Sequence, residues 1–77
     1  MKKIALTRLK AGRKAKVIEI SGALLQSRLM SMGIYPGREI TKMSSFAMRG
    51  PVTIRLGRSS LALGHGMADK ILVVPDD

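Results

Sequence analysis

The sequence contains no cysteine, and this absence excludes disulfide bonds and any metal site built on thiolates. Tryptophan is also absent, and Tyr35 and Phe46 are the only aromatic residues among 77. A hydrophobic core must therefore come from aliphatic side chains and methionine. With 45% hydrophobic residues the chain is nevertheless too apolar to be disordered.

Acidic residues and long apolar runs are also scarce. Five Asp and Glu stand against 14 Lys and Arg, which gives a formal net charge of +9. This excess favours a polyanionic or acidic partner, although charge also serves solubility alone. The basic start lacks the apolar stretch of a secretory signal, and no run is long enough to span a bilayer. We expect a cytoplasmic protein without membrane insertion, folded as one domain over residues 1–77.

Groups for catalysis or metal binding are few. His65 is the only histidine, and no nucleophile, base and orienting group can be assembled around it. With Asp69 four residues later it makes at most half of a metal site. We therefore expect a non-enzyme with no cofactor and no metal ligands.

Residues 21–38 contain the clearest helix signal in the chain. Ser21 suits the N-cap, because its hydroxyl can accept from a free backbone N–H of the first turn. Leu25, Leu29 and Met32 recur at helical spacing, which predicts a narrow buried stripe. The helix is therefore expected to lie on the core through these three residues.

The same stretch also carries a stop and a turn. Gly33 stands where a left-handed residue ends a helix, and Ile34 follows where a Schellman motif places a contact with Leu29. Tyr35-Pro36-Gly37-Arg38 then has Pro and Gly at the central positions of a type II turn. The chain should leave the helix sharply and enter an extended run.

The remaining chain reads as short strands and turns. Lys14 to Ile20 alternates, with a bulge expected near Ile18 or Glu19. In the strand after the helix, Ile40 and Met43 are the expected core residues. A 3₁₀-like turn is expected at residues 67–69 and a frayed tail from residue 75. The predicted strands cover residues 14–20, 38–48, 52–56, 61–63 and 70–74.

Five strands of this length, with one short helix after the first, predict a mainly β fold in the form of a small, partly closed barrel. Closure removes the exposed edges that an isolated small sheet would present.

Several short motifs appear along these elements in a fixed order: G-x-x-A-x-V-x-x-I, R-L-x-x-M-G-I-x-P-G, G-P-V-x-I, L-A-L and A-D-K-I-L-V. In this order they resemble the FeoA family (ferrous iron transport protein A), whose members are small SH3-like barrels. The resemblance spans residues 4–74, and Arg28 to Gly37 is its most specific part. The segment from Gly64 to Gly66 departs from it, because the family more often has a longer charged segment there.

The resemblance implies an accessory protein of bacterial ferrous iron uptake that docks on the membrane transporter FeoB, which carries a cytosolic GTP-binding domain. The same barrel also occurs as a C-terminal domain of iron-dependent repressors. Because the chain has no room for a helix-turn-helix, we expect the free-standing form. The predicted contact residues lie on the helix and its turn: Leu24, Arg28, Met30, Tyr35, Pro36 and Gly37.

Two other readings stay open. A nucleic-acid-binding barrel would use Arg13, Lys14 and Lys16 as phosphate contacts. Only two aromatic residues are available for stacking, so we do not expect nucleic acid as the partner. Weak homo-oligomers could form through the Met-rich surface.

Overall fold

The computed structural model describes residues 2–45 and 50–76. Along the chain the elements are β1 (Ile4–Ala5), η1 (Leu6–Arg8), β2 (Lys14–Ile20), α1 (Ala23–Ser31), β3 (Glu39–Ser45), β4 (Val52–Leu56), β5 (Ser59–Leu63), α2 (His65–Ala68) and β6 (Ile71–Pro75). The predicted far end of the third element, residues 46–48, lies outside the described residues.

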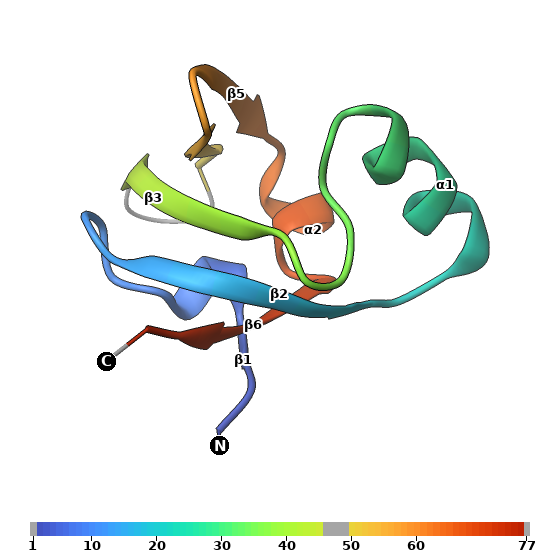
Figure 1. Cartoon of the computed structure of the whole chain (residues 1–77), viewed down its shortest axis with the longest axis horizontal. Coiled ribbons are helices and arrows are strands. Elements are labelled where there is room, and N and C mark those ends of the chain that lie inside the picture. Colours follow the sequence, from blue (N-terminus) through green and yellow to red (C-terminus); the bar gives the residue numbers. More distant parts are fainter. Residues whose placement is uncertain (1, 46–49, 77) are drawn as a thin grey trace.

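The six described strands form one sheet in the order β1-β6-β2-β3-β4-β5, and every neighbouring pair is antiparallel. In Figure 1 the strands curl around the short helix α2, while α1 stands apart at one end of the molecule. The expected mainly β architecture is confirmed, with a two-residue strand β1 added before the strands that the sequence predicted.

The core is filled by the alternate side chains of β2 and β4 that point inward. Val52, Ile54 and Leu56 of β4 are all buried, and Ala15, Val17 and Ile20 of β2 face the same interior. The pairing of β2 with β6 shifts between Val17 and Glu19, which confirms the predicted bulge. The extra residue of the bulge shifts the alternation of buried and exposed side chains by one position, so that Ile20 faces the core.

Lys42, not Met43, is the buried residue in the middle of β3. Lys42 is 1% exposed and Met43 is 43% exposed, so the expectation that Met43 belongs to the core is wrong. Ile40 is buried, as expected, and side chains two apart in a strand share a face, so Lys42 follows it inward. The Lys42 ammonium is accommodated there by three backbone carbonyls.

The start of α1 also differs from the sequence expectation. Gly22 is the N-cap, with φ 96°, and no side chain caps the helix. Ser21 instead donates its backbone N–H to the carbonyl of Lys70 at 3.1 Å, so it still belongs to the contact with the C-terminal segment. The helix therefore begins at Ala23, one residue later than a Ser21 cap would require.

The buried face of α1 is narrower than predicted. Leu29 is fully buried and Leu25 half-buried, whereas Met32 is 42% exposed. Met32 is the C-cap, with φ −95° and ψ 0°, so it has left the helical spacing that placed it on the stripe. The prediction that Met32 packs in the core is wrong for this reason.

The end of α1 is a complete Schellman motif. Ile34 donates its N–H to the carbonyl of Leu29 at 2.8 Å, and Gly33 donates to Met30 at 3.0 Å. Gly33 has φ 91°, in the left-handed region that the motif needs. Ile34 and Leu29 are both fully buried in the same hydrophobic cluster.

The C-terminal third is more regular than expected. The segment predicted to make a 3₁₀-like turn is one turn of α-helix, His65–Ala68. β6 continues through Pro75, and Asp76 donates its N–H to the carbonyl of Lys14 at 2.9 Å. The expectation of fraying from residue 75 is thus wrong for Pro75 and Asp76, which are held against β2.

Candidate functional site

Helix α1 exposes most of its surface. Leu24 is 68% exposed and Met30 is 61% exposed, the largest values among the large hydrophobic residues whose side chains the structure describes. Only Leu29 of this nine-residue helix is buried. α1 therefore presents apolar side chains to solvent, while it packs on the core through the buried Leu29 and the half-buried Leu25.

Leu24 and Arg28 share one flank of α1, because residues four apart lie one above the other on a helix. Both line a shallow hollow of about 340 Å³ between the start of α1 and Lys70. We call this hollow the α1 groove; its described lining consists of Ser21, Gly22, Ala23, Leu24, Leu25, Arg28 and Lys70. It combines an exposed leucine with two cationic side chains.

Met30 lies on the other flank of the helix. At about 100° per residue it is turned about 120° from Leu24, and it is not part of the described lining of the α1 groove. The two predicted apolar contacts thus straddle the solvent side of α1. A partner protein would have to cover the whole solvent side of α1 to contact both residues.

Tyr35, Pro36 and Gly37 form the turn after α1. Arg38 donates its N–H to the Tyr35 carbonyl at 3.0 Å, and Gly37 has φ 97°, as the predicted type II turn requires. The turn is fixed to β2, since Gly37 donates to the Val17 carbonyl at 2.8 Å and Val17 donates to the Arg38 carbonyl at 2.9 Å. Its exposed side chains are therefore carried on a backbone anchored in the sheet.

Tyr35 has a cationic neighbour that the sequence analysis did not include. The Arg38 guanidinium carbon lies 6.0 Å from the centre of the Tyr35 ring, and Arg38 Nη1 donates to the Tyr35 hydroxyl at 3.5 Å. Lys70, in the α1 groove, was missed as well. Its place beside α1 depends on the pairing of β6 with β2, which local sequence patterns do not reveal.

The described residues contain no group of three or more His, Cys, Asp or Glu side chains that could hold a metal ion. One carboxyl pair is notable. A hydrogen bond with the Asp76 side chain and the charge of Asp76 raise the pKa of Glu39 above its ordinary value, while Lys14 and Lys16 act in the opposite direction. Within residues 2–45 and 50–76, no helix is long and apolar enough to cross a membrane.

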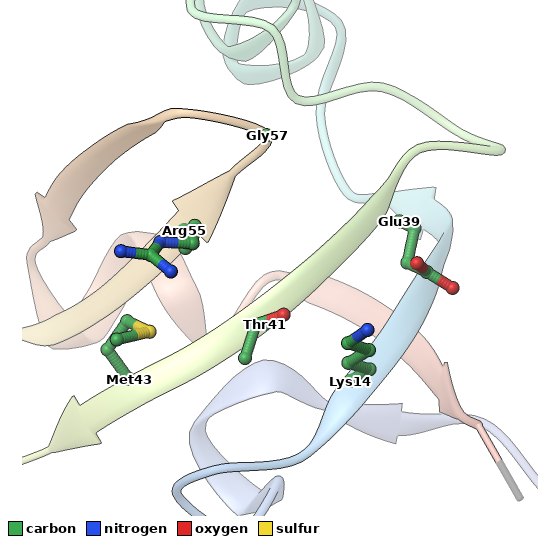
Figure 2. A pocket seen from close by; sticks show the side chains of 6 residues that line it. All are labelled: Lys14, Glu39, Thr41, Met43, Arg55 and Gly57. Atoms are coloured by element: carbon green, nitrogen blue, oxygen red, sulfur yellow. The ribbon is translucent and has the colours of Figure 1, made fainter.

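A second hollow lies on the outer face of β2, β3 and β4, and it also has a volume of about 340 Å³. Its described lining comprises Lys14, Glu39, Thr41, Met43, Arg55 and Gly57. Figure 2 shows these side chains on the side of the sheet away from the core. We call this hollow the sheet groove; its described lining has no residue in common with that of the α1 groove.

Comparison with known proteins gives a consistent result. A family model of the FeoA domain matches residues 4–75. The crystal structure of an iron uptake regulatory protein, FeoA, is 30% identical, with a TM-score of 0.86, and the alignment covers 99% of this chain and 100% of that one. The solution structure of a FeoA-like protein from Clostridium acetobutylicum is 34% identical, with a TM-score of 0.84 and coverage of 97% and 88%. None of the curated proteins compared matches the sequence.

The fold extends to a different class of protein. A manganese-dependent transcriptional repressor has a TM-score of 0.86 at 21% identity, over 96% of this chain and 42% of the repressor. This likeness concerns the fold alone. Together these structures confirm the expected small SH3-like barrel.

Proposed function

This chain belongs to the FeoA family, which is linked to ferrous iron transport, and we propose that it is an accessory protein that docks on a FeoB-type transporter. In this proposal the contact lies on the cytosolic GTP-binding domain of the transporter. The docking face consists of the solvent side of α1 and the turn that follows, with Leu24, Arg28, Met30, Tyr35, Pro36 and Gly37. It acts by binding and carries no catalytic step.

The exposure of Leu24 and Met30 is the observation that carries the proposal. Interfaces draw most of their binding energy from a few apolar or aromatic side chains that enter pockets of the partner. A helix with two such residues on its solvent side presents them on a rigid frame, so little conformational entropy is lost on binding. Burial of one leucine side chain contributes about 1.5–3 kcal/mol.

Charge beside these anchors supports an acidic partner surface. Arg28 and Lys70 flank Leu24 in the α1 groove, and Arg38 lies beside Tyr35. Such cations accelerate encounter with an acidic surface and orient the two proteins, while the apolar contacts supply the affinity. The binding should therefore decline only modestly when salt is raised.

The experiment is an NMR titration of the isotope-labelled full chain with the cytosolic part of its cognate transporter at physiological salt. Amide shifts concentrated on residues 24–37 are the expected result. Shifts spread over Arg13, Lys14 and Lys16 and abolished by modest salt would contradict the α1 contact. The absence of any shift would overturn docking on this part of the transporter.

Two serine variants give a matched comparison by calorimetry. Leu24→Ser should weaken binding at least about tenfold, because it removes an apolar anchor from the interface. Ala62→Ser also replaces an exposed apolar side chain, but it lies on the edge strand β5 and should leave the Kd unchanged. Equal effects of the two variants would contradict the assignment of α1.

A further inference from the structure

The sheet groove lies on one row of cross-strand neighbours. Lys14 of β2 is paired with Thr41 of β3, and Thr41 is paired with Arg55 of β4. Their chain neighbours Ala15, Ile40 and Ile54 are buried, so the three side chains of the row point away from the core. The Thr41 hydroxyl thus lies between two cations carried on the outer two of three adjacent strands.

The spacing of the two cations follows from the sheet. Adjacent strands are about 4.8 Å apart, so the backbones at Lys14 and Arg55 are about 10 Å apart across β3. Figure 2 shows Arg55 and Met43 at one end of the groove and Lys14 and Glu39 at the other, with Thr41 in the middle. A ligand must therefore extend across the strands to reach both cations.

Charge in and around the groove is mostly positive. The ion pair found among the described residues joins Lys3 to Glu19, so neither Lys14 nor Arg55 is paired with a described carboxylate. Lys16 lies opposite Glu39, and Arg38 reaches the rim, where its Nη2 would lie 3.5 Å from a Cβ at Gly57. Glu39, the one acidic residue of the described lining, lies at the Lys14 end, and its interaction with Asp76 raises its pKa. The centre and the Arg55 end are left with unneutralised positive charge.

From this arrangement we propose that the sheet groove binds an extended acidic segment of a protein partner. A glutamate or aspartate carboxylate can accept two parallel hydrogen bonds from the Arg55 guanidinium, and a second carboxylate can reach Lys14. In an extended peptide, side chains two residues apart are about 7 Å apart on one face, within reach of these long cationic side chains. The Thr41 hydroxyl is available to a carboxylate or a peptide carbonyl between them.

The lining favours a peptide over a nucleic acid. None of the described lining residues is aromatic, so no platform for base stacking is present among them. Glu39 would repel a continuous row of phosphates, whereas a peptide carries its carboxylates at intervals and can place an uncharged residue beside Glu39. Met43, 43% exposed, offers an apolar surface beside Arg55 for an uncharged side chain between two acidic ones. The site is separate from the α1 face, so it does not depend on the docking proposed above.

The test measures fluorescence anisotropy of three labelled probes with the full chain at low salt. The probes are an octapeptide of alternating glutamate and valine, the corresponding glutamine and valine octapeptide, and an oligothymidine of eight nucleotides. The glutamate peptide is expected to bind and the glutamine peptide is not. Failure of the glutamate peptide to bind, or tighter binding of the oligothymidine through the same groove, would overturn the proposal.

Two double variants with the same net charge distinguish binding in the sheet groove from binding by the overall charge of the protein. Lys14→Gln combined with Arg55→Gln should weaken binding of the glutamate peptide at least about tenfold, because both charge-assisted contacts are lost. Arg8→Gln combined with Lys10→Gln removes the same charge from exposed residues outside the groove and should change the Kd less than about twofold. Equal weakening by the two pairs would show that net charge alone binds the peptide. Amide shifts on Thr41 and Met43 in the wild type should accompany binding.

Discussion

Lys42 Nζ donates a hydrogen bond of 2.6 Å to the carbonyl oxygen of Leu9, although the two residues are 33 positions apart in the sequence. The same ammonium donates to the carbonyls of Leu6 and Thr7 at 3.1 and 3.0 Å. All three donors of the ammonium are therefore used. Lys42 ties β3 to the turn of η1, and it replaces the hydrogen bonds that these carbonyls would otherwise make with water.

Replacing Lys42 should destabilise the protein strongly. Lys42→Met keeps most of the apolar stem but removes the ammonium donor from the carbonyls of Thr7 and Leu9 and leaves the Leu6 carbonyl only the Leu9 N–H, so we expect a loss of about 2–4 kcal/mol in the free energy of unfolding. Urea denaturation followed by circular dichroism measures this loss. Lys16→Met, on an exposed position of β2, should change the stability by less than about 0.5 kcal/mol. Wild-type stability of Lys42→Met would show that the three carbonyls do not need the ammonium.

Gly33 should not tolerate a side chain, for reasons of backbone conformation. Its φ of 91° is unfavourable for alanine, while an added Cβ would meet only Leu56 Cδ1 at 3.8 Å, an ordinary contact. Gly33→Ala should therefore lower the free energy of unfolding by about 1–2 kcal/mol. Gly66→Ala, in α2 and with open space around it, should be neutral or slightly stabilising. Similar losses in the two variants, compared by thermal unfolding, would contradict this explanation.

Two leucines of α1 should separate stability from binding. Leu29→Ala creates a cavity at the only fully buried position of the helix, and we expect a loss of about 2–5 kcal/mol. Leu24→Ala, at a side chain that is 68% exposed, should leave the urea midpoint almost unchanged. A large loss of stability in Leu24→Ala would mean that this residue serves packing, and would weaken its assignment as a docking anchor.

Stability should depend on pH through Glu39. Its pKa is raised above the ordinary value of 4.5, chiefly by the hydrogen bond with Asp76. The folded protein thus holds this proton more tightly than the unfolded chain does. The stabilisation is fully present below pH 4.5 and is lost as pH rises through the raised pKa of the folded protein.

Glu39→Gln removes this titration and keeps a hydrogen-bond donor for Asp76. The variant should melt at a higher temperature than the wild type at pH 7 and at nearly the same temperature at pH 3, where the carboxyl is protonated in both states. Glu19→Gln, which removes a charge from the Lys3 pair at 3.0 Å, should not raise the melting temperature at pH 7. A lower melting temperature of Glu39→Gln at pH 7 would mean that Lys14 and Lys16 outweigh Asp76.

The features that local chemistry determines were predictable from the sequence. The Schellman end at Gly33, the turn at Pro36-Gly37 and the alternation of β4 each depend on a few adjacent residues, and the structure confirms all three. Strand β2 has the predicted bounds, Lys14–Ile20, because its alternation and its bulge are visible in its own sequence.

The features that depend on distant partners were not predictable in the same way. A lysine in the core becomes acceptable only when three carbonyls from η1 and its end surround it, and no pattern around Lys42 indicates those partners. Lys70 enters the α1 groove because β6 pairs with β2, which is a tertiary contact. The sequence predicted that Leu24 and Met30 are exposed, because both lie off the apolar stripe of the helix. That they lie on opposite flanks of α1 became clear only from the structure of the helix.

The position of β6 affects how the protein is made on the ribosome. β6 is the last strand to be synthesised among the described elements, yet it pairs with β1 on one side and with β2 on the other. Until residues 71–75 leave the exit tunnel, the facing edges of β1 and β2 have no partner, and hydrophobic side chains of the first strands have nothing to close over them. Such late, non-local pairing slows folding and lengthens the exposure to aggregation. We therefore expect the sheet to close only after residues 71–75 have emerged, and nascent chains halted before β6 to need protection by chaperones.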